Sequence, residues 1–101
     1  MFDPYWDDED GFLRFEFTDD KVFAHATVSS WNKRVYIKCL AMWSEAKREL
    51  KELGYNDIFV IIPNNDKKLI KFEKIFGFVP LSISDKYLLM VCNNTGEEHG
   101  S

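Results

Sequence analysis

The stretch "KLIKFEKIFGF", residues 68–78, predicts a short amphipathic helix that ends at a glycine and passes directly into an aromatic residue. The residues that mark its buried side are Leu69, Phe72 and Phe76. Gly77 ends the helix, because glycine adopts backbone conformations that other residues resist. "VPLSI" and "KYLLMVC" follow as two closing strands, so residues 68–78 join a helix to a sheet.

A longer helix is predicted upstream, over residues 33–53, with Gly54 as its C-terminal cap. Its core-facing stripe is expected to consist of Tyr36, Leu40, Trp43, Ala46, Leu50 and Leu53. The run "DIFVIIP", residues 57–63, comes next. Its nearly continuous apolar character is typical of a strand buried on both faces.

The N-terminal half predicts a hairpin from "FLRFEFT" and "VFAHATVS", whose alternation has the period of half-buried strands. In the second strand, His25 lies on the face opposite Val22 and Ala24. The predicted order is β-β-α-β-α-β-β, a mixed sheet flanked by helices in the α/β (α+β) class. Residues 1–11 are expected to form an acidic aromatic arm, residues 12–92 one domain, and residues 93–101 a disordered tail.

The composition suits one small cytoplasmic domain of 101 residues, 46% of them hydrophobic. The N-terminus is acidic where a signal peptide would be basic, and no window is long and apolar enough for a membrane span. Cys39 and Cys92 are expected to be buried, reduced thiols. The two histidines leave no set of residues that would build a metal site.

Charge is distributed unevenly along the chain. Residues 1–20 hold eight acids and one base, a net charge of −7, whereas the remaining 81 residues hold 12 bases and 9 acids, a net charge of +3. General nucleic-acid binding is therefore not expected. The lysines near residues 33–38 and 67–74 are either solvated helix faces or a patch for phosphates or an acidic partner. A third alternative is that the arm lies across the body, within one subunit or between two.

The order of elements, with Gly54-Tyr55, Gly77-Phe78 and the "YLLMV" strand, resembles the C-terminal two thirds of the GNAT acetyltransferase superfamily. The resemblance covers about residues 12–92, and the amino-acid sequence of residues 31–78 is most similar to small acetyltransferase-like proteins of bacteriophages. It implies a GNAT-like fold in which the Gly-Phe turn swings the chain into the terminal hairpin. Phe78 would then fill the core.

The resemblance also implies a cofactor, acetyl-coenzyme A, held between two splayed parallel strands with its pyrophosphate on the N-terminus of the long helix. The family's glycine-containing phosphate loop corresponds to residues 34–39 here. The candidate cofactor-binding residues are Arg34, Val35, Tyr36, Ile37, Lys38 and Cys39, with Lys68 from the short helix. Val35, Ile37 and Cys39 stand where glycines or a small residue are expected, so the motif is degenerate.

Two residues are candidates for catalysis. The family often has a tyrosine four residues before the Gly of Gly-Phe, where it protonates the departing thiolate, and here that position is Glu73. A carboxylate needs a raised pKa for this role. His25 lies on the strand that lines the acetyl group in the family, and an imidazole accepts protons near neutral pH. The alternative for His25 is an ordinary half-exposed histidine on a sheet.

Two classes of function follow. One is transfer of an acetyl group from acetyl-coenzyme A to a small-molecule or protein amine. The other is a catalytically inactive phage protein that binds or inhibits a host protein through its acidic arm and surface, since both family motifs are missing. The arm either imitates DNA phosphates or packs on its own domain. Neither class requires a membrane, and the sequence leaves the oligomeric state and the acceptor open.

Overall fold

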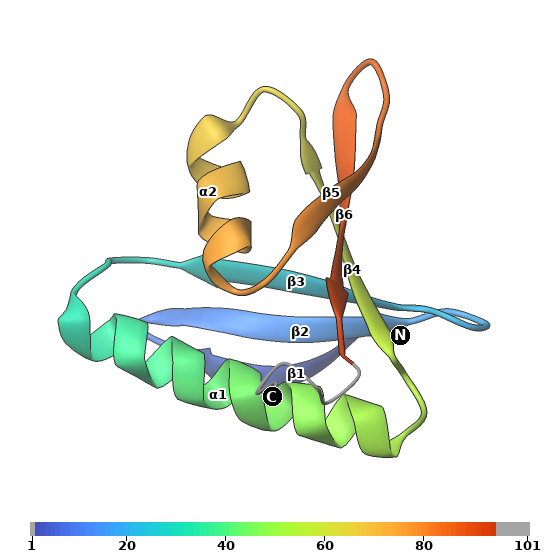
Figure 1. The fold of residues 1–101 in the computed structure, drawn as a ribbon. Helices are drawn as coiled ribbons and strands as arrows, with labels where there is room; N and C mark the ends of the chain where they lie inside the picture. The colour runs from blue at the N-terminus through green and yellow to red at the C-terminus, as the bar shows by residue number, and fades with distance from the viewer. Residues whose placement is uncertain (1, 95–101) are drawn as a thin grey trace, which may run out of the picture.

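A computed structural model describes residues 2–94 and contains one six-stranded mixed sheet and two helices (Figure 1). The strands are β1 (Phe2–Asp8), β2 (Gly11–Phe17), β3 (Val22–Val28), β4 (Asp57–Pro63), β5 (Val79–Ile83) and β6 (Tyr87–Asn93), and the helices are α1 (Lys33–Glu52) and α2 (Lys67–Ile75). Their order across the sheet is β1-β2-β3-β4-β6-β5. The predicted mixed α/β class is confirmed.

One face of the sheet carries the core. Its buried residues are cross-strand partners, as at Phe15 and Ala24, Val22 and Ile58, or Val60 and Met90, so they point to the same side. Both helices pack on this side, and the residues through which they meet are Trp43 of α1 with Phe76 and Phe78. Both described helices lie on the core side, so among the described residues no helix covers the opposite face of the sheet.

The buried stripe of α1 differs from the predicted one. It consists of Val35, Cys39, Trp43, Ala46 and Leu50. Tyr36 is 39% exposed and Leu53, which caps the helix, is 68% exposed. The predicted stripe was wrong in its first turns, because apolar residues at 35, 36, 37 and 39 leave the phase of a helical stripe ambiguous.

Residues 1–11 were expected as an arm, but Phe2–Asp8 form strand β1, antiparallel to β2. The sheet therefore has one strand more than the predicted order. β1 lies at the edge of the sheet, where an irregular register between Pro4 and Trp6 and several charges are tolerated because one side of the strand needs no partner. The predicted tail falls mostly on residues 95–101, outside the described residues. Within residues 2–94, no helix is long and apolar enough to cross a membrane.

The two parallel strands β3 and β4 separate along their length. They pair only at Val22 with Ile58 and at Phe23 with Phe59, next to the start of both strands. Beyond these pairs β3 runs toward α1 while β4 turns away toward α2 (Figure 1). The backbone edge of residues 24–28 that faces β4 therefore has no strand partner.

The strand β4 is covered on one face only. Ile58, Val60 and Ile62 are buried, whereas Ile61 is 57% exposed. The prediction that both faces are buried was wrong. The run is apolar nearly throughout, which is why burial on both faces was predicted. Within residues 2–94, however, no second layer covers the other face of β4.

Candidate functional site

An open groove of about 390 Å³ lies between the end of β3 and the first turns of α2. Its walls are Ala26, Thr27 and Val28 of β3, Trp31, and Asp66, Lys68, Leu69 and Phe72 at α2. Two of these side chains are charged, and their charges are of opposite sign. The groove borders the part of β3 that has left β4, next to the place that the resemblance gives to a cofactor, but it lacks a strongly basic lining.

Both helix ends near this groove are capped by the chain's own side chains. Asn32 accepts a hydrogen bond from the backbone N–H of Val35 at 2.9 Å, and Asp66 accepts one from Leu69 at 3.0 Å. A helix N-terminus attracts an anion through its free N–H groups. Here a side-chain oxygen takes one of those donors at each helix, and at α2 that oxygen carries a negative charge.

The predicted phosphate-binding loop, residues 34–39, forms the first turns of α1. Val35 and Cys39 point into the core and are buried. The described glycines with a positive backbone φ, of the kind that shapes a phosphate loop, are Gly11, Gly54 and Gly77, and none of these lies at this helix end. Residues 34–39 therefore offer a regular, capped helix in place of a loop.

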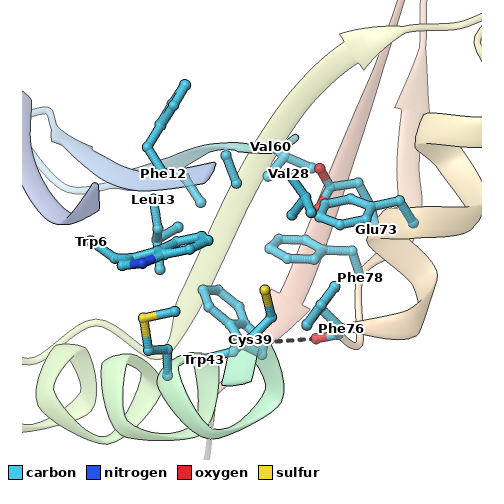
Figure 2. Close-up of a pocket in the computed structure, with 14 residues that line it drawn as sticks. Trp6, Phe12, Leu13, Val28, Cys39, Trp43, Val60, Glu73, Phe76 and Phe78 are labelled. Atoms are coloured by element: carbon cyan, nitrogen blue, oxygen red, sulfur yellow. Dashed lines mark hydrogen bonds between the residues drawn. The ribbon is translucent and has the colours of Figure 1, made fainter. Parts of the chain in front are cut away.

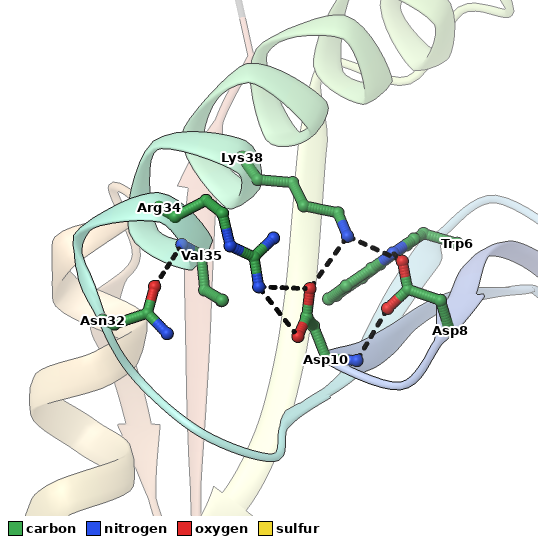
Figure 3. A network of polar contacts seen from close by, with 7 residues as sticks. All are labelled: Trp6, Asp8, Asp10, Asn32, Arg34, Val35 and Lys38. Atoms are coloured by element: carbon green, nitrogen blue, oxygen red, sulfur yellow. Dashed lines mark hydrogen bonds and ion pairs between the residues drawn. The ribbon is translucent and has the colours of Figure 1, made fainter.

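The two basic candidates, Arg34 and Lys38, are paired with carboxylates of the chain itself (Figure 3). Lys38 Nζ lies 2.6 Å from Asp8 and 3.1 Å from Asp10, and Arg34 lies 3.3 Å from Asp10. Hydrogen bonds from Lys38 and then from the Trp6 indole lower the pKa of Asp8 to about 2. The same bonds, that to Asp8 foremost, raise the pKa of Lys38. At these acids, the alternative that the acidic segment lies across its own body is confirmed.

Trp31 lies at the mouth of the groove. Its ring is 5.5 Å from Phe72 of α2 and 6.1 Å from Tyr36 of α1, so it bridges the two helices. Lys68 and Lys71 flank it on α2. With Trp31 in the mouth, both helix ends capped and Arg34 neutralised by Asp10, the residues present do not fit the pyrophosphate of acetyl-coenzyme A.

His25 is placed on the face of the sheet opposite the helices, and it does not meet Glu73. Its Nε2 lies 3.1 Å from a carboxylate oxygen of Glu16 on β2, and both side chains are partly exposed. A carboxylate beside an imidazole orients the ring through a hydrogen bond. His25 therefore lies on the solvent-facing side of β3, with Glu16 as its neighbour on β2.

Glu73 lies on the other side of the sheet, in an apolar cavity between α1, α2 and the strands (Figure 2). It is 7% exposed, so its carboxylate oxygens keep a small contact with solvent, and among the described residues none donates a hydrogen bond to them. Burial raises the pKa of Glu73 to about 7. The sequence singled out Glu73 by its spacing from Gly77, but it gave no sign that a carboxyl group would be enclosed by aromatic rings.

A third feature is an uncovered apolar surface on the face of the sheet opposite the helices. Phe59 pairs with Val91, which pairs with Val79, and Phe23 stacks beside Phe59 with ring centroids 5.7 Å apart. The next row on this face consists of Ile61 and Leu89, followed by Tyr87. We call these seven residues the apolar face. Ile61 and Val79 are 57% and 56% exposed, a degree unusual for aliphatic side chains gathered in one patch.

Comparison with solved structures shows which fold this is. A spermidine N-acetyltransferase, a chimera of SpeG from Vibrio cholerae and hSSAT, has a TM-score of 0.55 at 11% identity and matches over 88% of this chain and 60% of its own. An uncharacterized protein from Bacillus halodurans has a TM-score of 0.57 at 19% identity over 92% and 64%. This chain thus spans less than two thirds of each. No protein-family model and no curated protein matches the sequence. The likeness shows the fold of an N-acetyltransferase, as the resemblance implied.

Proposed function

We propose that this acetyltransferase-fold protein acts by binding a partner protein through its apolar face and does not transfer acetyl groups from acetyl-coenzyme A. The observation that carries the proposal is the closed phosphate site: Asn32 caps the helix at which a pyrophosphate would bind, and Asp10 neutralises Arg34. Fold by itself does not establish activity, because the same scaffold supports many functions. The function is therefore argued from the surfaces this chain presents.

The apolar face supports the binding half of the proposal. It crosses four adjacent strands, and it ends at the edge strand β5, where Val79, Leu81 and Ile83 are all exposed. An uncovered apolar patch of this kind marks an interaction site in soluble proteins, because leaving it in water costs free energy. The occupant we infer is a host protein that meets a bacteriophage-encoded binder in the cytoplasm, in keeping with the sequence resemblance to phage proteins.

The acidic N-terminal segment is a weaker candidate for the partner surface. Asp8 and Asp10 are already paired with Lys38 and Arg34, so a partner would have to displace contacts within the chain. Tyr5 and Trp6 pack against the core. The interpretation of this segment as a DNA mimic is therefore not the one we propose, and the apolar face takes its place.

The first test is calorimetric titration of the purified protein with acetyl-coenzyme A. We expect no heat of binding and no thermal shift at millimolar ligand. The matched variant is Asp10→Asn, which removes one carboxylate from Arg34 and Lys38 and so leaves both cations more available to the phosphates of the ligand. Micromolar binding by the wild-type chain, weakened by Arg34→Ala, would refute the proposal that acetyl-coenzyme A is excluded.

The second test concerns the apolar face. Capture from host cells is compared for the wild type, for Ile61→Glu on the apolar face and for Leu53→Glu, which changes a similarly exposed residue at the end of α1. The proposal expects a partner that the wild type and Leu53→Glu retain and that Ile61→Glu loses. A partner held equally by all three proteins would contradict it, as would self-association of the wild type through the same face.

A second candidate, amine acetylation, is favoured by one specific observation. The unpaired edge of β3 and the His25–Glu16 pair lie on the same strand, so a thioester carbonyl could accept a backbone N–H bond while His25 takes the amine proton. This candidate predicts acetyl transfer that His25→Gln abolishes while the fold is unchanged. In the calorimetric titration, binding of acetyl-coenzyme A would support amine acetylation, whereas no binding would support the partner-binding function.

A further inference from the structure

The cavity around Glu73 combines features that a folding role does not explain. It is lined by Leu13, Ala24, Ala26, Val28, Val60, Phe72, Phe76 and Phe78, with Trp6, Phe12, Cys39, Met42 and Trp43 on the other sides. Figure 2 shows the Glu73 side chain extending from α2 toward the part of the cavity where Val28 and Val60 lie. A single carboxyl group thus faces a lining of hydrocarbon, sulfur and aromatic rings.

The carboxyl group is isolated from compensating charge. The lining contains no lysine, arginine or histidine, and its other titratable group is the Cys39 thiol, whose pKa is raised by burial so that it stays neutral. Among the described residues no group donates a hydrogen bond to the Glu73 carboxylate, whose oxygens keep only a small contact with solvent. A buried carboxylate without a partner is costly, and an alanine or leucine would fill the place more favourably.

The size of the cavity limits what it takes. Its volume is about 50 Å³. One water needs about 10–15 Å³, so there is room for about three to five non-hydrogen atoms. Water in this cavity meets one charged side chain in a lining that otherwise consists of hydrocarbon, sulfur and aromatic rings. A small organic molecule with an apolar body and one polar end matches the lining better.

We propose that this cavity is a binding site for a short primary alkylamine, held as its ammonium ion against Glu73 with its alkyl chain among the aromatic rings. The ammonium ion supplies the opposite charge and the hydrogen-bond donors that Glu73 lacks. The rings of Phe72, Phe76 and Trp43 suit a cation as well as a hydrocarbon chain, because their faces carry negative quadrupole charge. The site goes beyond the proposed function and lies on the face of the sheet opposite His25.

The negative charge of Glu73 should make the site bind an alkylammonium ion more tightly than an alcohol or a carboxylic acid of the same size. A carboxylic acid of similar size would place two acids together, and one of them would have to stay protonated. An alcohol would gain one hydrogen bond but no ion pair. The site should therefore rank propylammonium above propanol, and propanol above propionate.

The test is a titration of the full chain with n-propylammonium chloride, followed by backbone amide chemical shifts in two-dimensional NMR. We expect saturable shifts at the cavity-lining residues, with n-propanol binding more weakly. Because the pKa of Glu73 is about 7, apparent affinity should rise about tenfold from about pH 6 to about pH 8 as the carboxyl group ionises. Binding that is independent of pH, or shifts that map elsewhere, would overturn the proposal.

Two variants sharpen the result. Glu73→Gln keeps the shape of the side chain and removes the charge, so propylammonium binding should be lost while n-propanol binding persists. Ala26→Leu keeps Glu73 and fills the cavity, so both ligands should lose affinity. The matched control is Glu52→Gln, at an exposed carboxylate of α1, and it should behave as the wild type. Equal propylammonium affinity in Glu73→Gln and the wild type would contradict the assignment.

Discussion

The indole Nε1 of Trp43 donates a buried hydrogen bond to the carbonyl oxygen of Phe76 at 2.8 Å, which ties the middle of α1 to the C-cap residue of α2 (Figure 2). The Cys92 thiol approaches the same carbonyl at 3.7 Å. A helix ends with carbonyl groups that lack partners inside the helix. Here one of them is satisfied by a tryptophan 33 positions earlier in the chain, so the packing of the two helices and the end of α2 depend on one another.

Trp43→Phe should destabilise the fold by about 2 kcal/mol, since it removes this hydrogen bond, leaves a buried carbonyl underused and reduces the buried ring area. Urea unfolding measures the change. The matched control is Trp31→Phe, where the tryptophan is partly exposed and donates no hydrogen bond to another described residue. Its cost should be less than half as large. Equal costs would mean that ring area alone, and not the bond to Phe76, stabilises the helix junction.

Gly77 makes the turn from α2 into the sheet, and its φ of +97° lies in the region that favours glycine. Gly77→Ala should cost about 1–2 kcal/mol for the backbone conformation. It should cost more again because the new Cβ would lie 3.3 Å from the Cys92 sulfur. Gly54→Ala is the control, since its φ is +101° but nothing lies within 4 Å of the new Cβ. Urea unfolding should show a larger loss at Gly77, and Cys92→Ala should narrow the difference.

Three strands show which parts of the fold could be predicted from the sequence and which could not. β3 was found with the correct buried face, because Val22 and Ala24 alternate with Phe23 and His25. β1 was missed, because an edge strand needs neither a clean alternation nor the absence of proline and charge. β4 was found but given two buried faces, because an apolar run does not reveal whether the chain supplies one covering layer or two.

The candidate site was predicted less well, for a physical reason. Spacing from Gly54 and Gly77 located residues 34–39 and Glu73, and of these Cys39 and Glu73 line the same cavity. Spacing did not reveal that Asn32 would cap the helix, that Asp10 would reach Arg34, or that Glu73 would be enclosed. These contacts join residues distant in the sequence, and local patterns carry no information about them.

The ion pairs of Lys38 should be visible in acid. Asp8 has its pKa lowered to about 2 in the folded chain from 3.8, so its pairing stabilises the fold above about pH 4 and is lost as the pH falls toward 2. Lys38→Met removes the pairing, so the variant should melt a few degrees below the wild type at neutral pH. The two melting curves should converge in acid.

The control for Lys38 is Lys71→Met, at an exposed lysine of α2 for which the described residues show no ion pair. Its melting temperature should follow that of the wild type at every pH. Lys38 also lies 5.2 Å from the ring of Trp6. A gap between Lys38→Met and the wild type that persists unchanged in acid would assign the stabilisation to this ring contact and not to Asp8.

Glu73→Gln should stabilise the protein, and the gain should depend on pH with the opposite sign to that at Asp8. The pKa of Glu73 is raised to about 7 from 4.5, so the folded chain binds the proton more tightly than the unfolded chain does. Ionisation therefore costs stability as the pH rises from about 4.5 through 7, up to about 3 kcal/mol by linkage. Glutamine removes that cost. Urea unfolding should show little difference at about pH 4 and the largest gain at about pH 8. A gain that is the same at both would mean that Glu73 is not an ionising group in this cavity, and the ammonium site would lose its charge.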